Sequence, residues 1–211
     1  MLETELIPGS ERDSRWLMIV LHGLGDSMEG YRWLPGVMQL GWLNYLLVNA
    51  PMPYYGGFSW YDFAGDPGPD IEHSRKLLFS LLDDQRAAGF PTERTFVFGF
   101  SQGCLMAWEI GLGYPHLLGG LVGISGYCHA PEVLLRKLSP VALKQKFLIS
   151  HGTRDALIPF DQVREQSQMI QRAGLAVEWR EFEKEHTIAG EDEMSVVRDF
   201  VVKRRSELEA R

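Results

Sequence analysis

Short runs of apolar residues alternate with amphipathic stretches along most of this chain. The runs are continuous rather than alternating with polar residues, which is typical of strands in a parallel sheet covered by helices on both faces. The pattern predicts strands over residues 16–21, 45–48, 95–98, 118–124, 147–150 and 176–182.

The stretches between these runs carry apolar residues at helical spacing and are predicted to be helices. Asp161 is expected to cap the start of one of them, and Gly174 to end it. The succession of strands and helices predicts a three-layer α/β fold with its functional loops at the carboxyl ends of the strands. No repeat or polar linker divides the chain, so residues 1–211 are expected to form one domain. The predicted helices cover residues 29–40, 71–88, 102–112, 161–173 and 190–209.

Composition narrows the range of partners. The formal net charge of −7 argues against a general affinity for nucleic acid. No apolar run reaches about 18 residues, the length of a membrane span, and the acidic first residues do not resemble a signal peptide. Cys104 and Cys128 form neither a disulfide framework nor a metal-binding pattern. These features favour a cytoplasmic location and no metal or organic cofactor.

Residues 96–105 (FVFGFSQGCL) join an apolar run to a helical stretch through the pattern Gly-X-Ser-X-Gly. A strand that turns sharply into a helix strains the residue at the turn and exposes its side chain. Gly99 and Gly103 would let the strand and the helix pass closely. Ser101 is therefore predicted to be an exposed nucleophile beside the positive end of a helix dipole.

Two residues after later strands supply the rest of the chemistry that a serine nucleophile needs. Asp155 follows the fifth predicted strand and His186 the sixth, and the order serine, acid, histidine is that of α/β-hydrolases. The histidine must remove the hydroxyl proton, and the carboxylate must orient the imidazole ring. Asp161 competes as the acid but is better explained as a helix cap. The sequence thus predicts a catalytic triad of Ser101, Asp155 and His186.

The other five histidines are given structural roles. His22 ends the first predicted strand and is expected to shape the loop that follows. His151 is expected to be buried and hydrogen-bonded, whereas His73, His116 and His129 are expected to be structural or surface residues.

Acyl transfer also needs two hydrogen-bond donors for the oxyanion that forms on the carbonyl oxygen. Gln102, directly after the nucleophile, can supply one backbone N–H. Leu24 is predicted to supply the other, because Gly23 and Gly25 let its N–H turn inward. The alternative is that these glycines only form a tight turn.

Residues 51–70 are rich in proline, glycine and aromatic side chains. A loop of this length is uncommon in a compact domain unless it has a function. Phe58, Trp60 and Tyr61 are candidates for one wall of an apolar substrate-binding groove. The alternative, which is compatible with the first, is that they pack as a small core beneath the loop.

Together these segments resemble the phospholipase/carboxylesterase family, which includes acyl-protein thioesterases and small bacterial carboxylesterases. The resemblance implies an α/β-hydrolase fold with a mostly parallel central sheet, no large lid domain, and activity on carboxylic esters or thioesters. It implies Ser101, Asp155 and His186 as the triad and the N–H groups of Leu24 and Gln102 as the oxyanion hole. The matching segments are LHGLGD (21–26), NAP (49–51), GGFSWYD (56–62), GFSQG (99–103), HGTRDALIP (151–159) and the loop around His186.

Two positions depart from the family pattern. Glu185 stands before His186 where the family usually has glycine, and Cys104 follows GFSQG where it tends to have another glycine. Cys104 is interpreted as a buried structural thiol rather than a nucleophile. Neither change removes a catalytic group.

The sequence therefore predicts a serine carboxylesterase for short- to medium-chain esters, with thioesters and lysophospholipids as further candidates. The preference for shorter chains rests on the lack of a large lid insertion that could cover a long one. Two alternatives stay open. One is a catalytically silent α/β-hydrolase that acts as a binding or scaffolding protein, and the other is a peptidase or acyltransferase with the same triad.

Overall fold

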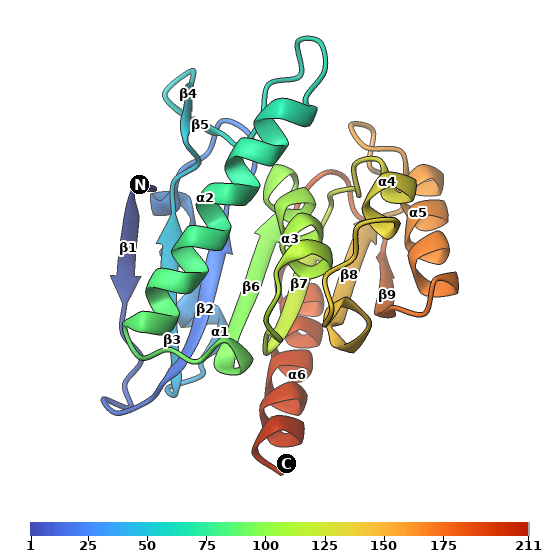
Figure 1. The fold of residues 1–211 in the computed structure, drawn as a ribbon. Coiled ribbons are helices and arrows are strands. Elements are labelled where there is room, and N and C mark those ends of the chain that lie inside the picture. Colours follow the sequence, from blue (N-terminus) through green and yellow to red (C-terminus); the bar gives the residue numbers. More distant parts are fainter. Residues whose placement is uncertain (211) are drawn as a thin grey trace.

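The computed structural model describes residues 1–210 (Figure 1). Its main sheet has seven strands in the order β1-β3-β2-β6-β7-β8-β9. Only β1 runs antiparallel to its neighbour. All six predicted strands are present. The strands of this sheet are β1 (Thr4–Ile7), β2 (Trp16–Leu21), β3 (Leu43–Val48), β6 (Thr95–Phe100), β7 (Gly120–Ile124), β8 (Lys146–Gly152) and β9 (Ala176–Phe182).

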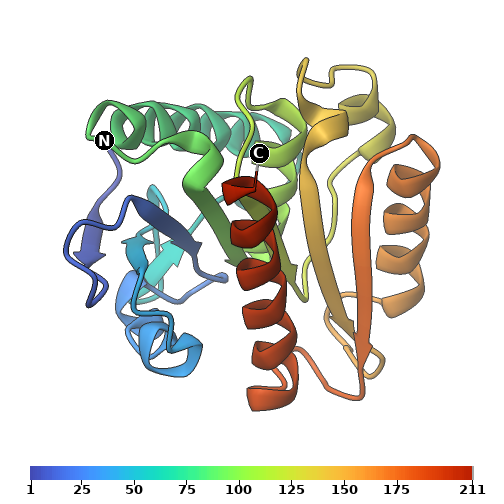
Figure 2. The same ribbon diagram turned by 90° about the horizontal axis from the view of Figure 1, so that it is seen from below.

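Helices cover both faces of the sheet, and each face has its own hydrophobic core. Seen from below, α2 and α6 lie on opposite sides of the strands (Figure 2). One core includes residues of α2 (Gly68–Ala87), α3 (Gln102–Gly113), α4 (Pro131–Leu135) and α5 (Phe160–Arg172). The other includes residues of α1 (Leu34–Met38) and α6 (Gly190–Glu209). Three 3-10 turns span Met28–Tyr31, Thr92–Arg94 and Ala142–Lys144.

Several expectations about the elements are wrong. Residues 29–40 form a 3-10 turn and the separate helix α1, because Pro35 is suited to the first turn of a helix and not to its interior. Asp161 is not a cap: Pro159 holds that position, and Asp161 lies in the first turn of α5, where its charge favours the helix dipole. Gly174 does follow α5 with a φ of +93°, as expected. The pattern also missed β1, α4 and the hairpin of β4 (Met52–Tyr54) and β5 (Gly57–Ser59).

The strand order places a topological switch point between β2 and β6. The chain passes from β2 to β3 on one side and later enters β6 on the other side of β2. In open α/β sheets, ligands bind outside the carboxyl ends of the strands at such a point. The loops that follow β2 and β6 therefore face a shared crevice. Within residues 1–210, no helix has both the length and the apolar character needed to cross a membrane.

Candidate active site

Ser101 occupies the sharp turn between β6 and α3. Its φ of 54° and ψ of −115° are strained for a residue with a side chain. A Cβ at Gly99 would overlap the backbone oxygen of Gly103, and one at Gly103 would overlap that of Leu21, so only glycine fits at both positions. The Ser101 N–H donates to the Ile124 oxygen at 2.9 Å, which ties the turn to the neighbouring strand β7.

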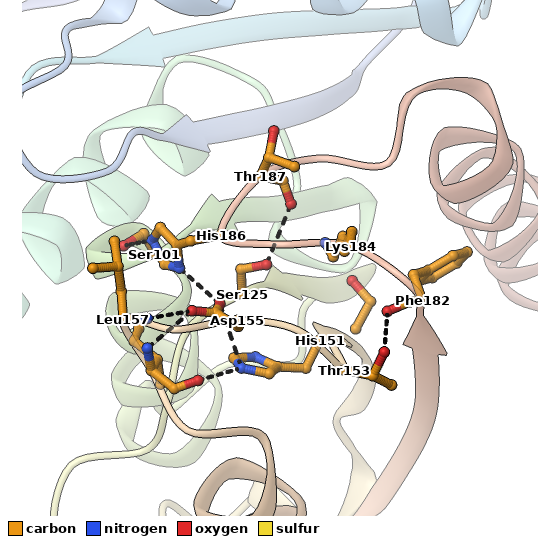
Figure 3. A network of polar contacts seen from close by, with 12 residues as sticks. Ser101, Ser125, His151, Thr153, Asp155, Leu157, Phe182, Lys184, His186 and Thr187 are labelled. Atoms are coloured by element: carbon orange, nitrogen blue, oxygen red, sulfur yellow. Dashed lines mark hydrogen bonds and ion pairs between the residues drawn. The ribbon is translucent and has the colours of Figure 1, made fainter.

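The structure brings the three predicted triad side chains together (Figure 3). His186 lies in the loop after β9, with Nε2 2.9 Å from Ser101 Oγ and Nδ1 2.8 Å from Asp155 Oδ2. Asp155 lies in the loop after β8, where its Oδ1 accepts hydrogen bonds from the N–H groups of Leu157 at 3.0 Å and Ile158 at 2.9 Å. The carboxylate is thus held on one side by backbone donors and on the other by the imidazole ring.

The surroundings of Asp155 favour its charged form. Burial opposes ionisation of this carboxyl, but the N–H of Ile158 and the hydrogen bond and charge of His186 outweigh burial and lower its pKa. Because Nδ1 of His186 faces a carboxylate, we assign the ring proton to Nδ1. Nε2 then presents its lone pair to the hydroxyl of Ser101.

His22 fixes the loop after β2. Its buried Nε2 accepts a hydrogen bond from the Ala50 N–H at 3.1 Å, so its proton sits on Nδ1, which donates to the Gly23 oxygen at 2.6 Å. Burial lowers the pKa of His22, which keeps the ring neutral. A trans peptide directs its C=O and N–H to opposite sides, so holding the Gly23 oxygen toward His22 turns the Leu24 N–H away from it. Leu24 lines the cavity beside Ser101.

Gln102 contributes its backbone and its side chain differently. Its N–H is in the first turn of α3, where helix N–H groups have no partner within the helix, and Gln102 lines the same cavity. The side chain points elsewhere: Oε1 accepts from the Trp60 N–H at 2.8 Å, and Nε2 donates to the Tyr61 oxygen at 2.9 Å. Within residues 1–210, the N–H groups of Leu24 and Gln102 donate no hydrogen bond. Anchoring of the aromatic segment by Gln102 was not foreseen from the sequence.

A cavity of about 540 Å³ lies beside Ser101, a size typical of small-ligand sites. Most of its wall is apolar or aromatic, and Asp26 is the one acidic residue that the described part of the chain contributes to it. The apolar and aromatic residues of the wall are Leu24, Tyr61, Phe63, Phe100, Tyr127, Leu157, Ile158 and Pro159.

Only one of the three aromatic residues expected in the groove lies there. Tyr61 lines the cavity, but Phe58 and Trp60 do not. Trp60 is fully buried, and its indole Nε1–H donates to the His22 oxygen at 2.9 Å, while Phe58 packs against the core. The alternative of a small core beneath the loop holds for these two. Leu157 was missed, although its position two residues after the predicted acid, in the same loop, could have indicated it.

The side chains of the two residues that depart from the family pattern form no hydrogen bond or ion pair with the triad side chains in the described part of the chain. Cys104 is fully buried, and burial raises the pKa of its thiol to about 12, as expected for a structural residue. The Glu185 side chain is exposed and forms no ion pair with His186 in the described part of the chain.

The remaining histidines also lie outside the cavity wall. His151 is buried, as expected, and donates from Nε2 to the Ile158 oxygen at 2.9 Å. Burial lowers its pKa, so the ring is neutral. His73 is exposed, and His116 and His129 are partly exposed. Among residues 1–210, no three histidine, cysteine or acidic side chains are grouped to hold a metal ion.

A mostly parallel sheet with a serine at the turn after a central strand, and an acid and a histidine after later strands, defines an α/β-hydrolase. The profile of the phospholipase/carboxylesterase family matches residues 2–204, so the chain belongs to this family. It is therefore an enzyme, a serine hydrolase of the carboxylesterase and thioesterase type.

Individual relatives agree with this assignment. The chain is 32% identical over 159 residues to acyl-protein thioesterase 1 of Schizosaccharomyces pombe, covering 67% of this chain and 69% of that protein. It is 29% identical over 203 residues to acyl-protein thioesterase 1 of Yarrowia lipolytica, covering 87% and 89%. The crystal structure of esterase PE8 superposes with a TM-score of 0.84 at 25% identity, over 96% of this chain and 98% of that one.

Proposed function

We propose that this enzyme is a carboxylesterase that hydrolyses short- to medium-chain esters through a Ser101–His186–Asp155 triad. The observation that carries the proposal is the continuous line of contacts from Ser101 Oγ through both ring nitrogens of His186 to Asp155. Ser101 Oγ attacks the carbonyl carbon while His186 Nε2 accepts its proton. Asp155 holds the ring in the required tautomer and stabilises the imidazolium.

The remaining steps use the same groups. When the bond to the leaving alcohol or thiol breaks, His186 returns the proton to that group. Water then attacks the acyl-enzyme while His186 again accepts a proton, and the carboxylic acid leaves with Ser101 restored. The N–H groups of Leu24 and Gln102 are proposed to donate to the oxyanion at both stages. No metal or organic cofactor enters these steps.

The cavity supports an apolar acyl group of moderate size. Its walls are largely aliphatic and aromatic, and Phe63 and Leu157 are both exposed at its surface. Thioesters are a second substrate class, because the relatives named above are acyl-protein thioesterases. We also propose one domain spanning residues 1–211 and a cytoplasmic location, which two free buried cysteines suit because the fold needs no oxidising compartment.

Replacement of the nucleophile tests the mechanism. Ser101→Ala is expected to lower the turnover of p-nitrophenyl butyrate by more than about a thousandfold while leaving the melting temperature near that of the wild type. A fluorophosphonate probe should label the wild type and not the variant. Cys104→Ala is the matched control for a thiol nucleophile and should keep its activity within several-fold. Turnover by Ser101→Ala above about a thousandth of the wild-type value would contradict the proposed mechanism.

A substrate panel tests the acyl-group assignment separately. Wild-type enzyme is compared on p-nitrophenyl esters from acetate to palmitate, beside a butyryl thioester. We expect the highest kcat/KM on acyl groups shorter than palmitate. A clear preference for palmitate would overturn the chain-length proposal without affecting the triad.

A further inference from the structure

The proposed base, His186, lies in an irregular loop between β9 and α6, which we call the histidine loop (residues 183–189). Within the loop, the Thr187 N–H donates to the Glu185 oxygen at 2.8 Å. Ser125 adds a long hydrogen bond to the Thr187 oxygen at 3.4 Å. The Lys184 N–H also donates to the Phe182 oxygen at 2.9 Å, at the start of the loop. Proton transfer needs a closely defined ring position, so the way in which both ends of the loop are anchored matters.

Glu193, in the first turn of α6, contacts both ends of the histidine loop. One end is Lys184, whose Nζ lies 2.6 Å from Glu193 Oε1 and 2.7 Å from Oε2. The other end is Ala189, whose N–H donates to Oε2 at 2.7 Å. The Ser150 hydroxyl of β8 donates to Oε1 at 2.6 Å. One carboxylate therefore joins the start of the loop, its end and the strand that leads to Asp155.

The backbone of Lys184 is tied to the same strand end. The Arg154 N–H donates to the Lys184 oxygen at 3.1 Å. Gly152 packs so closely against Lys184 that an added Cβ would overlap its backbone oxygen. Lys184 lies two residues before His186, and Figure 3 shows it on the segment that leads to His186. Any shift of Lys184 would therefore move the imidazole relative to Ser101.

The pair is buried, with side-chain exposures of 3% for Lys184 and 1% for Glu193. Burial lowers the pKa of Lys184, and the charge and hydrogen bonds of Glu193 oppose that effect. A buried ion pair is often no more stabilising than well-packed apolar residues of the same volume. A hydrogen-bonded ion pair fixes the relative positions of its two side chains more specifically than apolar packing does. A role in positioning explains the pair better than a role in stability.

We propose that Lys184 and Glu193 are positioning residues that clamp the histidine loop and hold His186 in line with Ser101 and Asp155. The inference rests on the proposed function, in which His186 is the base. It assigns a task to Lys184, which belongs to the stretch where this chain departs from the family pattern.

The test compares two single variants with the double variant, using p-nitrophenyl butyrate and thermal melts. Lys184→Met and Glu193→Gln each leave one buried group without its partner and should lower the melting temperature by roughly 10 °C. The double variant has no unpaired buried charge and should recover most of that loss. Its kcat should nevertheless stay roughly tenfold below the wild-type value, with KM little changed, because the Lys184 end of the loop is no longer held to α6.

Two controls make the result decisive. Arg75→Met/Glu109→Gln removes another ion pair with a buried carboxylate, between α2 and α3, and should leave kcat unchanged. His186→Ala should be almost inactive, and substantial activity in it would refute the proposed function itself. If His186→Ala is inactive but the double variant recovers both stability and kcat, or if the single variants keep wild-type kcat, the positioning role is wrong.

Discussion

The two loops that flank Ser101 are anchored in different ways. The loop after β2, residues 22–25, is held by neutral groups: the His22 ring on the Gly23 oxygen, and the Gly25 N–H on the Phe58 oxygen at 2.9 Å. The histidine loop is held by the charged pair of Lys184 and Glu193. The first loop presents a backbone N–H, and the second presents a side chain that must move a proton.

The difference follows from what each loop has to fix. Peptide planarity orients an N–H once the neighbouring carbonyl is held. For Leu24 that carbonyl is the Gly23 oxygen, which accepts neutral hydrogen bonds from His22 at 2.6 Å and from the Asp26 N–H at 3.3 Å. An imidazole ring at the end of a side chain inherits every displacement of a longer, irregular segment. Such a segment needs anchors at both ends, and Glu193 supplies them with a single carboxylate.

The largest effect on kcat is expected when the hydrogen bond from the neutral His22 ring to the Gly23 oxygen is removed selectively. In His22→Gln, the amide oxygen can still accept from Ala50, but the shorter of the two hydrogen bonds to the Gly23 oxygen is lost and only the 3.3 Å bond from the Asp26 N–H remains. In His22→Asn, the amide N–H can replace Nδ1 on Gly23, while the contact with Ala50 is lost. Removing one oxyanion donor costs about 10²–10³ in kcat, so misdirecting the Leu24 N–H in His22→Gln should cost roughly 10–100-fold.

Steady-state kinetics on p-nitrophenyl butyrate, with a melting curve for each protein, separates the two variants. His22→Asn should keep a kcat well above that of His22→Gln, although both lose stability. Equal kcat values in the two variants would mean that the hydrogen bond to Gly23 does not orient the Leu24 N–H.

The sequence predicts the apolar framework around Ser101 and the loop after β2 far better than it predicts the buried ion pair that holds the histidine loop. The buried strands and the turn at Ser101 follow from apolar runs and glycine spacing, which are local. The split of residues 29–40 was missed because apolar spacing outweighed the signal from Pro35. Strand β1 was missed because its residues are only partly buried and carry no continuous apolar run.

Contacts between distant segments explain the rest of what was missed. Trp60 looks like a groove residue from its aromatic neighbours, but its indole is turned inward by the His22 oxygen, 38 residues away. Lys184 and Glu193 look like two surface charges in a polar stretch, since burial of a charge is visible only once its partner is placed. The residues that react were identifiable from the sequence, and those that hold them in place were not.

Another buried carboxylate, that of Glu109, can be compared with Glu193 because it has fewer hydrogen-bond partners. Glu109 of α3 is 3% exposed, and within residues 1–210 its side chain pairs with Arg75 alone, at 3.3 Å, whereas Glu193 has three partners. Burial raises the pKa of Glu109 to about 7, against an ordinary value of 4.5. The folded protein therefore binds this proton more tightly than the unfolded chain, and the associated stability is lost as the pH rises through 7.

Glu109→Gln should remove this dependence, because glutamine is neutral at every pH. The free energy of unfolding of the variant minus that of the wild type should increase by about 2 kcal/mol from pH 5 to pH 8. Urea unfolding at the two pH values measures the change, and kcat at pH 8 should not move. If the two proteins differ in free energy of unfolding by the same amount at both pH values, Arg75 satisfies this carboxylate as fully as Lys184, Ser150 and Ala189 satisfy Glu193.

The smallest expected effect is on the stability of the protein at acidic pH, through the neutral ring of His22 that holds the loop after β2. Burial lowers the pKa of His22 below its ordinary value of 6.5, so the unfolded chain takes up a proton that the folded protein resists. Stability linked to His22 is present above pH 6.5 and is lost as the pH falls below it. His151 behaves in the same way, so the wild type should lose stability between pH 7 and pH 5 through both rings. His22→Asn should lose less stability than the wild type over that interval. Urea unfolding at pH 7 and pH 5 decides the matter: the same loss in both proteins would mean that His22 is protonated without cost, and that the loop after β2 is not held by a neutral ring.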